Sequence, residues 1–306
     1  MTLPPLDKLN MSLTKSRVAI ETQGCKLNQA DTEALLRHFI DAGFSVVDQD
    51  AQADVYIVNA CTVTHVADRK ARKSLRSARR RNPSAVVVAT GCYAQRAPNE
   101  LERMSAIDLV VGNKDKDRLV QMVVALRGDA PVPCATGDNV PIYPGVFGRT
   151  RTMIPIQKGC NQICAYCIVP KVRGREKSVS PDILLQQVSQ RIQEGFKEVV
   201  LTGTQLGSYG FDIPGASLAG LIELMLNKTT INRIRISSLQ PQMLNEHLLE
   251  LWQDARLCPH FHLPLQSGSN SVLRRMRRQY TTELFSHAVA RIRTLITKAS
   301  ITTDVL

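Results

Sequence analysis

The chain has 306 residues, of which 43% are hydrophobic and 22% charged, as expected for a folded protein with a buried core rather than a disordered one. The formal net charge of +12 favours a polyanionic partner, although charge alone does not separate nucleic-acid binding from a basic soluble surface. No stretch is long and apolar enough to cross a bilayer or to act as a secretory signal, so we expect a cytoplasmic protein without membrane association. Because the cytoplasm is reducing, we expect the eight cysteines to be metal ligands or reactive thiols rather than disulfides.

The first part of the chain alternates strands with helices. We predict strands at Arg17–Thr22, Val55–Val58 and Val86–Val88, and helices at Asp31–Gly43, with Asp31 as N-cap and Gly43 as the stop, and at Ala67–Arg81. This alternation predicts a doubly wound parallel sheet in an α/β fold. Ligands of such sheets collect outside the carboxyl ends of the strands.

Three cysteines occupy the same place relative to these strands. Cys25, Cys61 and Cys92 each stand just past a strand end, although they are 36 and 31 residues apart. Because parallel strands end at one edge of the sheet, we expect the three thiols to gather there. The alternative is three unrelated core cysteines, since free cysteine is among the most buried residue types.

A proline- and glycine-rich stretch between Arg127 and Arg149 indicates a linker. We therefore divide the chain into a first domain at residues 1–130, a linker at 131–148 and a second domain at 149–306. In the second domain the predicted strands are Thr152–Gln157, Glu198–Gly203, Arg233–Ser237, Phe261–Leu265 and one beginning at Ile301, and the predicted helices are Ile183–Glu194, Leu218–Lys228, Leu244–Asp254 and Thr282–Thr297. This repeated βα pattern predicts a full or partial βα barrel, whose active site lies at the carboxyl ends of its strands.

The second domain carries a CxxxCxxC motif formed by Cys160, Cys164 and Cys167. Three thiolates on one short loop are suited to hold three irons of a 4Fe-4S cluster and leave the fourth iron open. A structural zinc site is the alternative, but zinc requires a fourth cysteine or histidine, and the next histidine in the sequence is His247.

The run from Gly159 to Cys167 resembles the radical S-adenosylmethionine signature. The runs Gln23–Gln29, Asn59–Thr64 and Thr90–Gln95, which surround the first three cysteines, resemble the N-terminal domain of the methylthiotransferases. The resemblance extends from Arg17 to nearly the end of the chain. Within the family, the sequence is most similar to the branch that acts on N6-threonylcarbamoyladenosine in tRNA, and less similar to the branches that act on isopentenyladenosine or on an aspartate of a ribosomal protein.

The resemblance implies two 4Fe-4S clusters with different tasks. The cluster on Cys160, Cys164 and Cys167 would bind S-adenosylmethionine at its open iron and reduce it to a 5′-deoxyadenosyl radical. The cluster on Cys25, Cys61 and Cys92 would carry an additional sulfur, accept a methyl group from a first S-adenosylmethionine and deliver methylthio to carbon 2 of the adenine. Two S-adenosylmethionine molecules and an electron donor such as flavodoxin or ferredoxin are then required.

Further cofactor contacts follow from the resemblance and from the barrel pattern. The residues that we expect to face the cofactor at the barrel mouth are Tyr166, Thr202, Gly203, Ser237 and Gln266. Tyr166 is suited to pack on the adenine ring or simply on the top of the barrel, and the other four are equally suited to cap strand ends.

The predicted helix at Ala67–Arg81 is strongly basic and almost free of acids. Its first two thirds carry Arg69, Lys70, Arg72, Lys73 and Arg76. A solvated face is the usual explanation of such a run, but its position a few residues after Cys61 favours contact with tRNA phosphates close to the chemistry.

Relatives in this family continue beyond Asp304 with the rest of the barrel and a small C-terminal RNA-binding barrel, so we expect a C-terminally truncated chain with an incomplete barrel. This leaves a second class of function open, a non-catalytic iron-sulfur fragment that binds RNA.

Overall fold

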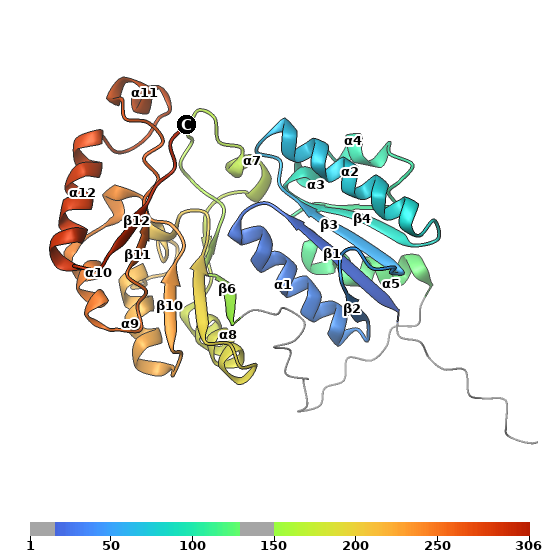
Figure 1. Cartoon of the computed structure of the whole chain (residues 1–306), viewed down its shortest axis with the longest axis horizontal. Coiled ribbons are helices and arrows are strands. Elements are labelled where there is room, and N and C mark those ends of the chain that lie inside the picture. Colours follow the sequence, from blue (N-terminus) through green and yellow to red (C-terminus); the bar gives the residue numbers. More distant parts are fainter. Residues whose placement is uncertain (1–15, 129–149) are drawn as a thin grey trace, which may run out of the picture.

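A five-stranded parallel sheet forms the first part of the protein in the computed structural model, which describes residues 16–128 and 150–306 (Figure 1). Its strand order is β2-β1-β3-β4-β5. The strands are β1 (Arg17–Gln23), β2 (Ser45–Val47), β3 (Val55–Ala60), β4 (Val86–Gly91) and β5 (Leu109–Val111). The chain reverses its direction across the sheet between β1 and β3, and this reversal places a crevice at the carboxyl ends of those two strands.

Helices cover both faces of this sheet, because its strands carry apolar side chains on both sides. Val55 and Ile57 of β3 face α1 (Lys26–Asp41) and α5 (Leu119–Arg127), whereas Tyr56 and Val58 face α2 (His65–Arg81) and the short helices α3 (Cys92–Arg96) and α4 (Pro98–Glu102). Every residue of β3 is buried. Burying one such aliphatic side chain contributes about 1.5–3 kcal/mol, so β3 anchors the sheet. The doubly wound parallel sheet is confirmed.

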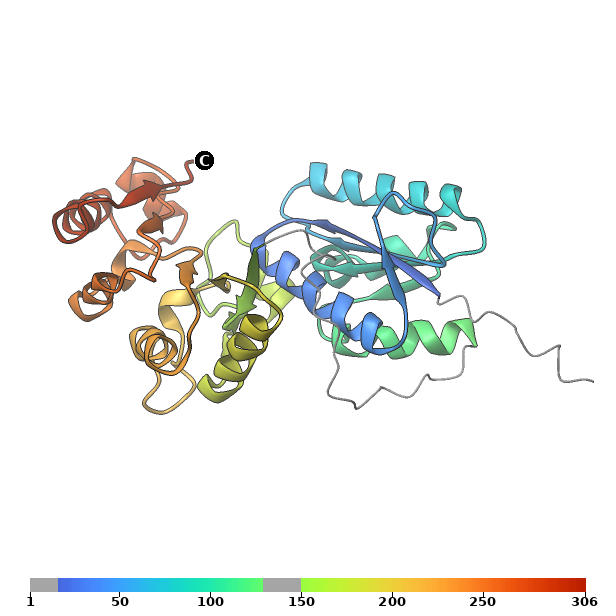
Figure 2. The ribbon, with the colours of Figure 1, turned by 60° about the horizontal axis from the view of Figure 1, so that its bottom comes forward.

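The second part of the protein is an open run of parallel strands with helices outside (Figure 2). Strands β6 (Arg151–Pro155), β9 (Glu198–Thr202) and β10 (Arg233–Ile236) form one sheet, and β11 (His260–His262) pairs with β12 (Ser300–Thr302). An isolated bridge between Ile234 and Leu257 joins β10 to the segment that leads into β11. Helices α8 (Pro181–Gln193), α9 (Leu218–Lys228), α10 (Glu246–Glu250) and α12 (Thr282–Leu295) share one apolar core with these strands. The arrangement agrees with the predicted partial βα barrel.

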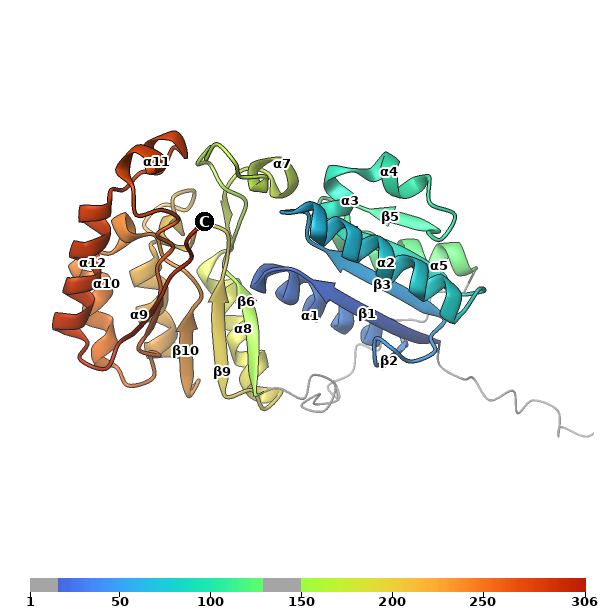
Figure 3. The same ribbon diagram turned by 45° about the horizontal axis from the view of Figure 1, so that its top comes forward.

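The two parts contact each other along α1, which lies beside β6 and β9 (Figure 3). Glu33 on α1 accepts hydrogen bonds from the Thr152 hydroxyl at 2.6 Å and from the Met153 backbone N–H at 3.2 Å. Burial raises the pKa of Glu33, and these hydrogen bonds partly oppose that rise. At the other end of the contact, α7 (Val169–Arg173) lies against α3.

Several predicted element boundaries were wrong. The first helix begins at Lys26 rather than at Asp31, because Cys25 is its N-cap and Asp31 is drawn into the interior by distant cations. The helix expected at Leu244–Asp254 is reduced to α10 and a 3-10 turn, because Asn245 caps it from within. The strand expected at Phe261–Leu265 is β11 instead, since Pro264 has no N–H to donate to a ladder.

The segment that we expected to be the linker, residues 131–148, lies outside the described residues together with Cys134. Strands β2 and β5 and helix α5 were not predicted. No helix in residues 16–128 or 150–306 is both long and apolar enough to span a membrane.

Candidate functional site

The first three cysteines follow neighbouring strands at one edge of the sheet. The register pairs Gln23 with Ala60 and Ala60 with Gly91, so the next residue positions are Gly24, Cys61 and Cys92. A Cβ atom on Gly24 would lie 2.8 Å from the Cβ of Cys61, so only glycine permits this approach. Burial raises the pKa of the Cys61 thiol, and the charges of Cys92 and Cys25 raise it further, as expected for thiols that lie close together.

The local backbone around these cysteines is suited to anions. Cys25 is the N-cap of the 16-residue helix α1. The backbone N–H groups of Val63 and Thr62 point to the sulfur of Cys61 and oppose the rise in its pKa. Helix N-termini and free N–H groups stabilise thiolates and the sulfides of a bound cluster.

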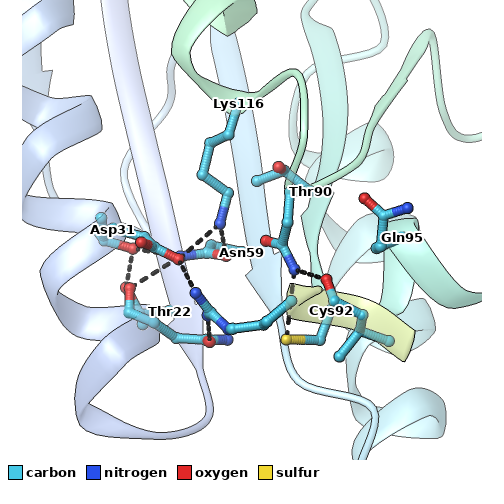
Figure 4. A network of polar contacts seen from close by, with 12 residues as sticks. Thr22, Asp31, Asn59, Thr90, Cys92, Gln95 and Lys116 are labelled. Atoms are coloured by element: carbon cyan, nitrogen blue, oxygen red, sulfur yellow. Dashed lines mark hydrogen bonds and ion pairs between the residues drawn. The ribbon is translucent and has the colours of Figure 1, made fainter. Parts of the chain in front are cut away.

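A buried polar network lies behind the first cysteine set (Figure 4). Lys116 extends between α1 and β3, where its Nζ atom is 2.9 Å from Asp31 Oδ2 and 3.3 Å from Asn59 Oδ1. Arg173 of α7 places its Nη1 atom 3.0 Å from the same Asp31 oxygen. Burial alone raises the pKa of Asp31, but the combined effect of Lys116 and Arg173 holds it below its ordinary value.

The second set stands on one loop between short strands β7 (Gln157–Lys158) and β8 (Lys177–Ser178) of the barrel. Gly159 has φ +73°, and a Cβ there would lie 2.0 Å from the Arg175 carbonyl oxygen, so the loop requires glycine. Burial raises the pKa of Cys160, and Cys167 and Cys164 add to the rise. The three thiols of this set therefore also lie within electrostatic reach of one another.

These donors fit iron-sulfur clusters better than a single metal ion. In the described part of the chain, no group of three or more His, Cys, Asp or Glu side chains converges closely enough to hold one ion. Thiolates that bind different irons of a cube do not need that convergence. All six thiols are free, and each set consists of sulfur donors.

Comparison with known families matches both parts of the chain. Residues 17–112 match the uncharacterized protein family UPF0004, and residues 154–306 match the radical SAM superfamily. The threonylcarbamoyladenosine tRNA methylthiotransferase MtaB of Aquifex aeolicus is 41% identical over 95% of this chain and 72% of its own length. The chain belongs to the radical S-adenosylmethionine methylthiotransferase family.

Other members of the family are also similar. MtaB of Bacillus subtilis is 38% identical over 94% of this chain and 66% of its own length. The tRNA-2-methylthio-N(6)-dimethylallyladenosine synthase of Dictyoglomus thermophilum is 34% identical, over 94% and 68% of the two chains. The present chain thus spans about two thirds of the length of these relatives.

Solved structures agree on the fold. The radical S-adenosylmethionine methyltransferase TsrM of Kitasatospora setae has a TM-score of 0.61 at 16% identity, covering 95% of this chain and 67% of that one. The cobalamin-dependent enzyme OxsB has a TM-score of 0.59 at 12% identity, covering 95% of this chain and 49% of its own. Both likenesses extend over 95% of this chain, so they support the overall fold of its two parts.

Tyr166 and Gln266 meet at the barrel mouth. The Tyr166 hydroxyl donates to Gln266 Oε1 and accepts from Arg278, whose guanidinium also lies 5.6 Å from the centre of the tyrosine ring. Gln266 has φ +66°, a strained value for a residue other than glycine. Tyr166 as a whole is 47% exposed, which leaves part of its surface available to a ligand.

The other predicted cofactor contacts lie at strand ends. Thr202 ends β9, and the Gly203 position is so close to the Gln157 carbonyl oxygen that a Cβ would stand 2.8 Å away. Ser237 follows β10, where its carbonyl oxygen accepts from the Lys26 ammonium at 3.5 Å. Because Lys26 is adjacent to Cys25, this contact links the start of α1 to the carboxyl end of β10.

Sequence reasoning missed polar residues that surround these sites. Thr204 Oγ1 and Gln205 Nε2 are buried beside Gly203 and have no hydrogen-bond partner among the described residues. Unpaired buried polar atoms are costly, so they are candidates to contact a ligand. The network residues Lys116 and Arg173 were missed as well, because no local pattern brings them together.

The basic helix α2 is divided by the structure into two groups. Arg69, Lys70, Lys73 and Arg76 are exposed. Arg72 instead binds the Tyr93 hydroxyl and Glu100, so it is engaged within the protein. Val63 and Val66, at the start of this helix, are 70% and 64% exposed beside the first cysteine set.

Proposed function

We propose that this protein transfers a methylthio group to carbon 2 of N6-threonylcarbamoyladenosine in tRNA, using two 4Fe-4S clusters and two molecules of S-adenosylmethionine. The proposal is supported by two three-cysteine sets that each follow the carboxyl end of a strand, and by the hydrogen bond from Lys26, next to Cys25, to the Ser237 carbonyl oxygen after β10. The greater similarity to relatives named for threonylcarbamoyladenosine favours that nucleoside.

The residues divide the work by position. Cys25, Cys61 and Cys92 would hold one cluster, and Cys160, Cys164 and Cys167 the other. When bound, the clusters and S-adenosylmethionine supply the electron transfer and the methyl and sulfur groups. The protein's own contribution is to place these groups around one cavity and to limit the access of water.

Three predicted cofactor contacts have distinct roles in this proposal. Tyr166 offers its ring face while Gln266 and Arg278 hold its hydroxyl. Thr202 and Gly203 close the end of β9, where the absence of a side chain on Gly203 lets the backbone pass close to Gln157. The two unpaired atoms of Thr204 and Gln205 lie at the same strand end and offer hydrogen bonds to it.

The substrate would approach over α2. Arg69, Lys70, Lys73 and Arg76 supply positive charge for tRNA phosphates. Exposed Val63 and Val66 offer apolar contacts next to the cysteines. A reduced electron carrier such as flavodoxin or ferredoxin is the remaining partner. We further propose that the two domains are divided at residues 131–148, and the family matches at residues 17–112 and 154–306 support this division.

Nucleoside mass spectrometry tests the proposal. The chain is reconstituted anaerobically with iron and sulfide, then incubated with S-adenosylmethionine, a reductant, sulfide and tRNA that lacks 2-methylthio groups. We expect 2-methylthio-N6-threonylcarbamoyladenosine from the wild type and from C258A, whose cysteine is buried away from both sets, and no product from C92A or C164A.

Two other outcomes would redirect the assignment. Methylthiolation of isopentenyladenosine alone would place the chain with the dimethylallyladenosine relatives. Loading with iron and binding of tRNA, but no cleavage of S-adenosylmethionine, would favour a non-catalytic iron-sulfur fragment.

A further inference from the structure

Arg173 belongs to the barrel in sequence but to the first cysteine set in space. It ends α7, a few residues after Cys167, and its side chain is only 6% exposed. Its Nη2 atom donates to Asn28 Oδ1 at 2.5 Å, and the same amide oxygen lies 3.7 Å from the Cys25 sulfur. One arginine therefore reaches the immediate surroundings of a cysteine on the other domain.

The opposite end of the set has a matching link. The Asn113 amide donates to the Val172 carbonyl oxygen at 2.9 Å and lies 3.6 Å from the Cys92 sulfur. Helix α7 is thus joined to Cys25 through Asn28 and to Cys92 through Asn113. Both links are specific to the first set, because among the described residues neither asparagine forms a hydrogen bond with a barrel cysteine.

The charges in this network do not balance. Lys116 and Arg173 share the single carboxylate of Asp31, and all three side chains are less than 10% exposed. Lys158 lines the same cavity and adds a further positive charge, while Asp117 offsets it at the rim. An unpaired charge is expensive to bury, so the network requires an anion on its remaining side. The sulfur atoms of Cys25 and Cys92 lie on that side, next to Asn28 and Asn113.

We propose that Arg173 is a positioning residue of the first cysteine set, which supplies the counter-charge for the cluster bound there and so raises its reduction potential from the barrel side. A nearby fixed cation stabilises the more negative, reduced state more than the oxidised state. Arg173 follows the second cysteine loop and belongs to the barrel part of the chain. The reduction potential of the first cluster therefore depends on whether the barrel is packed against the first domain. The inference rests on the proposed function only in requiring a cluster on the first set.

The test measures the potential rather than the activity. The full chain carrying C160A, C164A and C167A binds iron at the first set alone, and its midpoint potential is followed by electron paramagnetic resonance during a redox titration. For R173M we expect the equilibrium constant of one-electron reduction to fall at least tenfold, which makes the midpoint potential more negative by about 59 mV. R173K should restore most of the loss, because it keeps the charge. D31N should shift the equilibrium the opposite way, since it removes a negative charge.

R191M is the matched control. Arg191 is similarly buried and pairs with Glu194, which also meets Arg37 across the domain contact, but this network contains no cysteine. R191M should leave the potential unchanged. Equal potentials for R173M and R191M, or a more negative potential for D31N, would overturn the proposal. If R173M fails to hold iron while R173K and R191M hold it, the proposal is supported. If all three variants fail to hold iron, the midpoint potential of D31N is compared with that of the parent chain and decides the test.

Failure of this inference is distinct from failure of the proposed function. A parent chain that binds no cluster at the first set contradicts the proposed function. A parent chain that binds one with a potential insensitive to Arg173 contradicts only the role of this arginine.

Discussion

The two cysteine sets reach similar arrangements by different means. The second set is local, because its cysteines lie on one loop within eight residues of sequence. The first set is spread over three strand ends and exists only when β1, β3 and β4 pair in register. The first site is therefore a property of the folded sheet, whereas the second is a property of a loop and the backbone around it.

This difference has a consequence for stability. Slippage by one residue between β3 and β4 would move Cys92 away from Cys61 and also turn its side chain to the other face. The second set is insensitive to sheet register, but it depends on the backbone crossing of Gly159 and Arg175. The two sites should fail separately when each of these supports is changed.

The largest expected effect comes from glycines that support each set. At Gly91, with φ +92°, a Cβ would lie 2.6 Å from the Ala60 carbonyl oxygen; at Gly159 it would lie 2.0 Å from that of Arg175. Strain and overlap together cost about 2–5 kcal/mol. We expect G91A to lose the first cluster and G159A the second, measured as iron per chain.

G268A is the control for these glycines, because a Cβ at that position meets no atom within 4 Å. It should retain both clusters. Loss of both clusters from G91A and G159A alike would show that the two sites are not independent.

The next effect concerns Asp31, which supports the first set only. D31N leaves Lys116 and Arg173 buried without their carboxylate, and we expect a loss of about 3–5 kcal/mol of unfolding free energy at pH 7. Because the pKa of Asp31 is held low in the folded protein, its contribution is present above its unfolded pKa of about 4 and is lost as the pH falls through the lower folded value. Urea unfolding of the apoprotein at several pH values measures this.

The difference between wild type and D31N should therefore shrink as the pH falls below about 4. A difference that is equally large at pH 7 and in acid would exclude the ion pair as its source. Equal unfolding free energies of D31N and wild type at neutral pH would also exclude a stabilising contribution of this ion pair.

A smaller effect distinguishes the exposed from the engaged cations of α2. K70A and K73A should each weaken tRNA binding severalfold and reduce the salt slope of log K by about 0.9, because each removes one phosphate contact. R72A should destabilise the protein but leave the salt slope unchanged, since Arg72 is bound to Tyr93 and Glu100. Filter binding over a range of salt concentrations tests this, and equal slopes for all variants would contradict it.

The smallest effect is expected at the mouth of the second set. Y166F removes the hydroxyl that joins Gln266 and Arg278, and we expect about 1 kcal/mol weaker binding of S-adenosylmethionine, roughly fivefold in Kd. Y209F, whose hydroxyl binds the Val179 carbonyl oxygen within the core, is the control and should leave the Kd unchanged. Calorimetric titration of the reconstituted chain measures both, and an unchanged Kd for Y166F would argue against this role.

The sequence predicted the parts of this structure that depend on local pattern. Alternation of strands and helices gave the doubly wound sheet and the partial barrel, and the repeated position of the cysteines placed them at one sheet edge. It did not predict Asp31 as an interior residue, because an acid before an apolar run has the pattern of an N-cap. Only the fold shows that Lys116 and Arg173, 85 and 142 residues away, neutralise it.

In the candidate site, too, only the residues that carry a local sequence pattern could be predicted. Cysteine spacing is a strong local signal, whereas Asn28, Asn113 and Arg173 carry none. Arg72 belongs to the same basic pattern, and no local signal indicates that its guanidinium binds Tyr93 and Glu100.

Counting iron and acid-labile sulfide in anaerobically reconstituted chains tests the central claim most directly. We predict about eight irons per chain in the wild type and about four in each of two triple variants, C25A/C61A/C92A and C160A/C164A/C167A. About four irons in the wild type, with none of them lost from the first triple variant, would contradict the claim that the strand-end cysteines bind a cluster of their own.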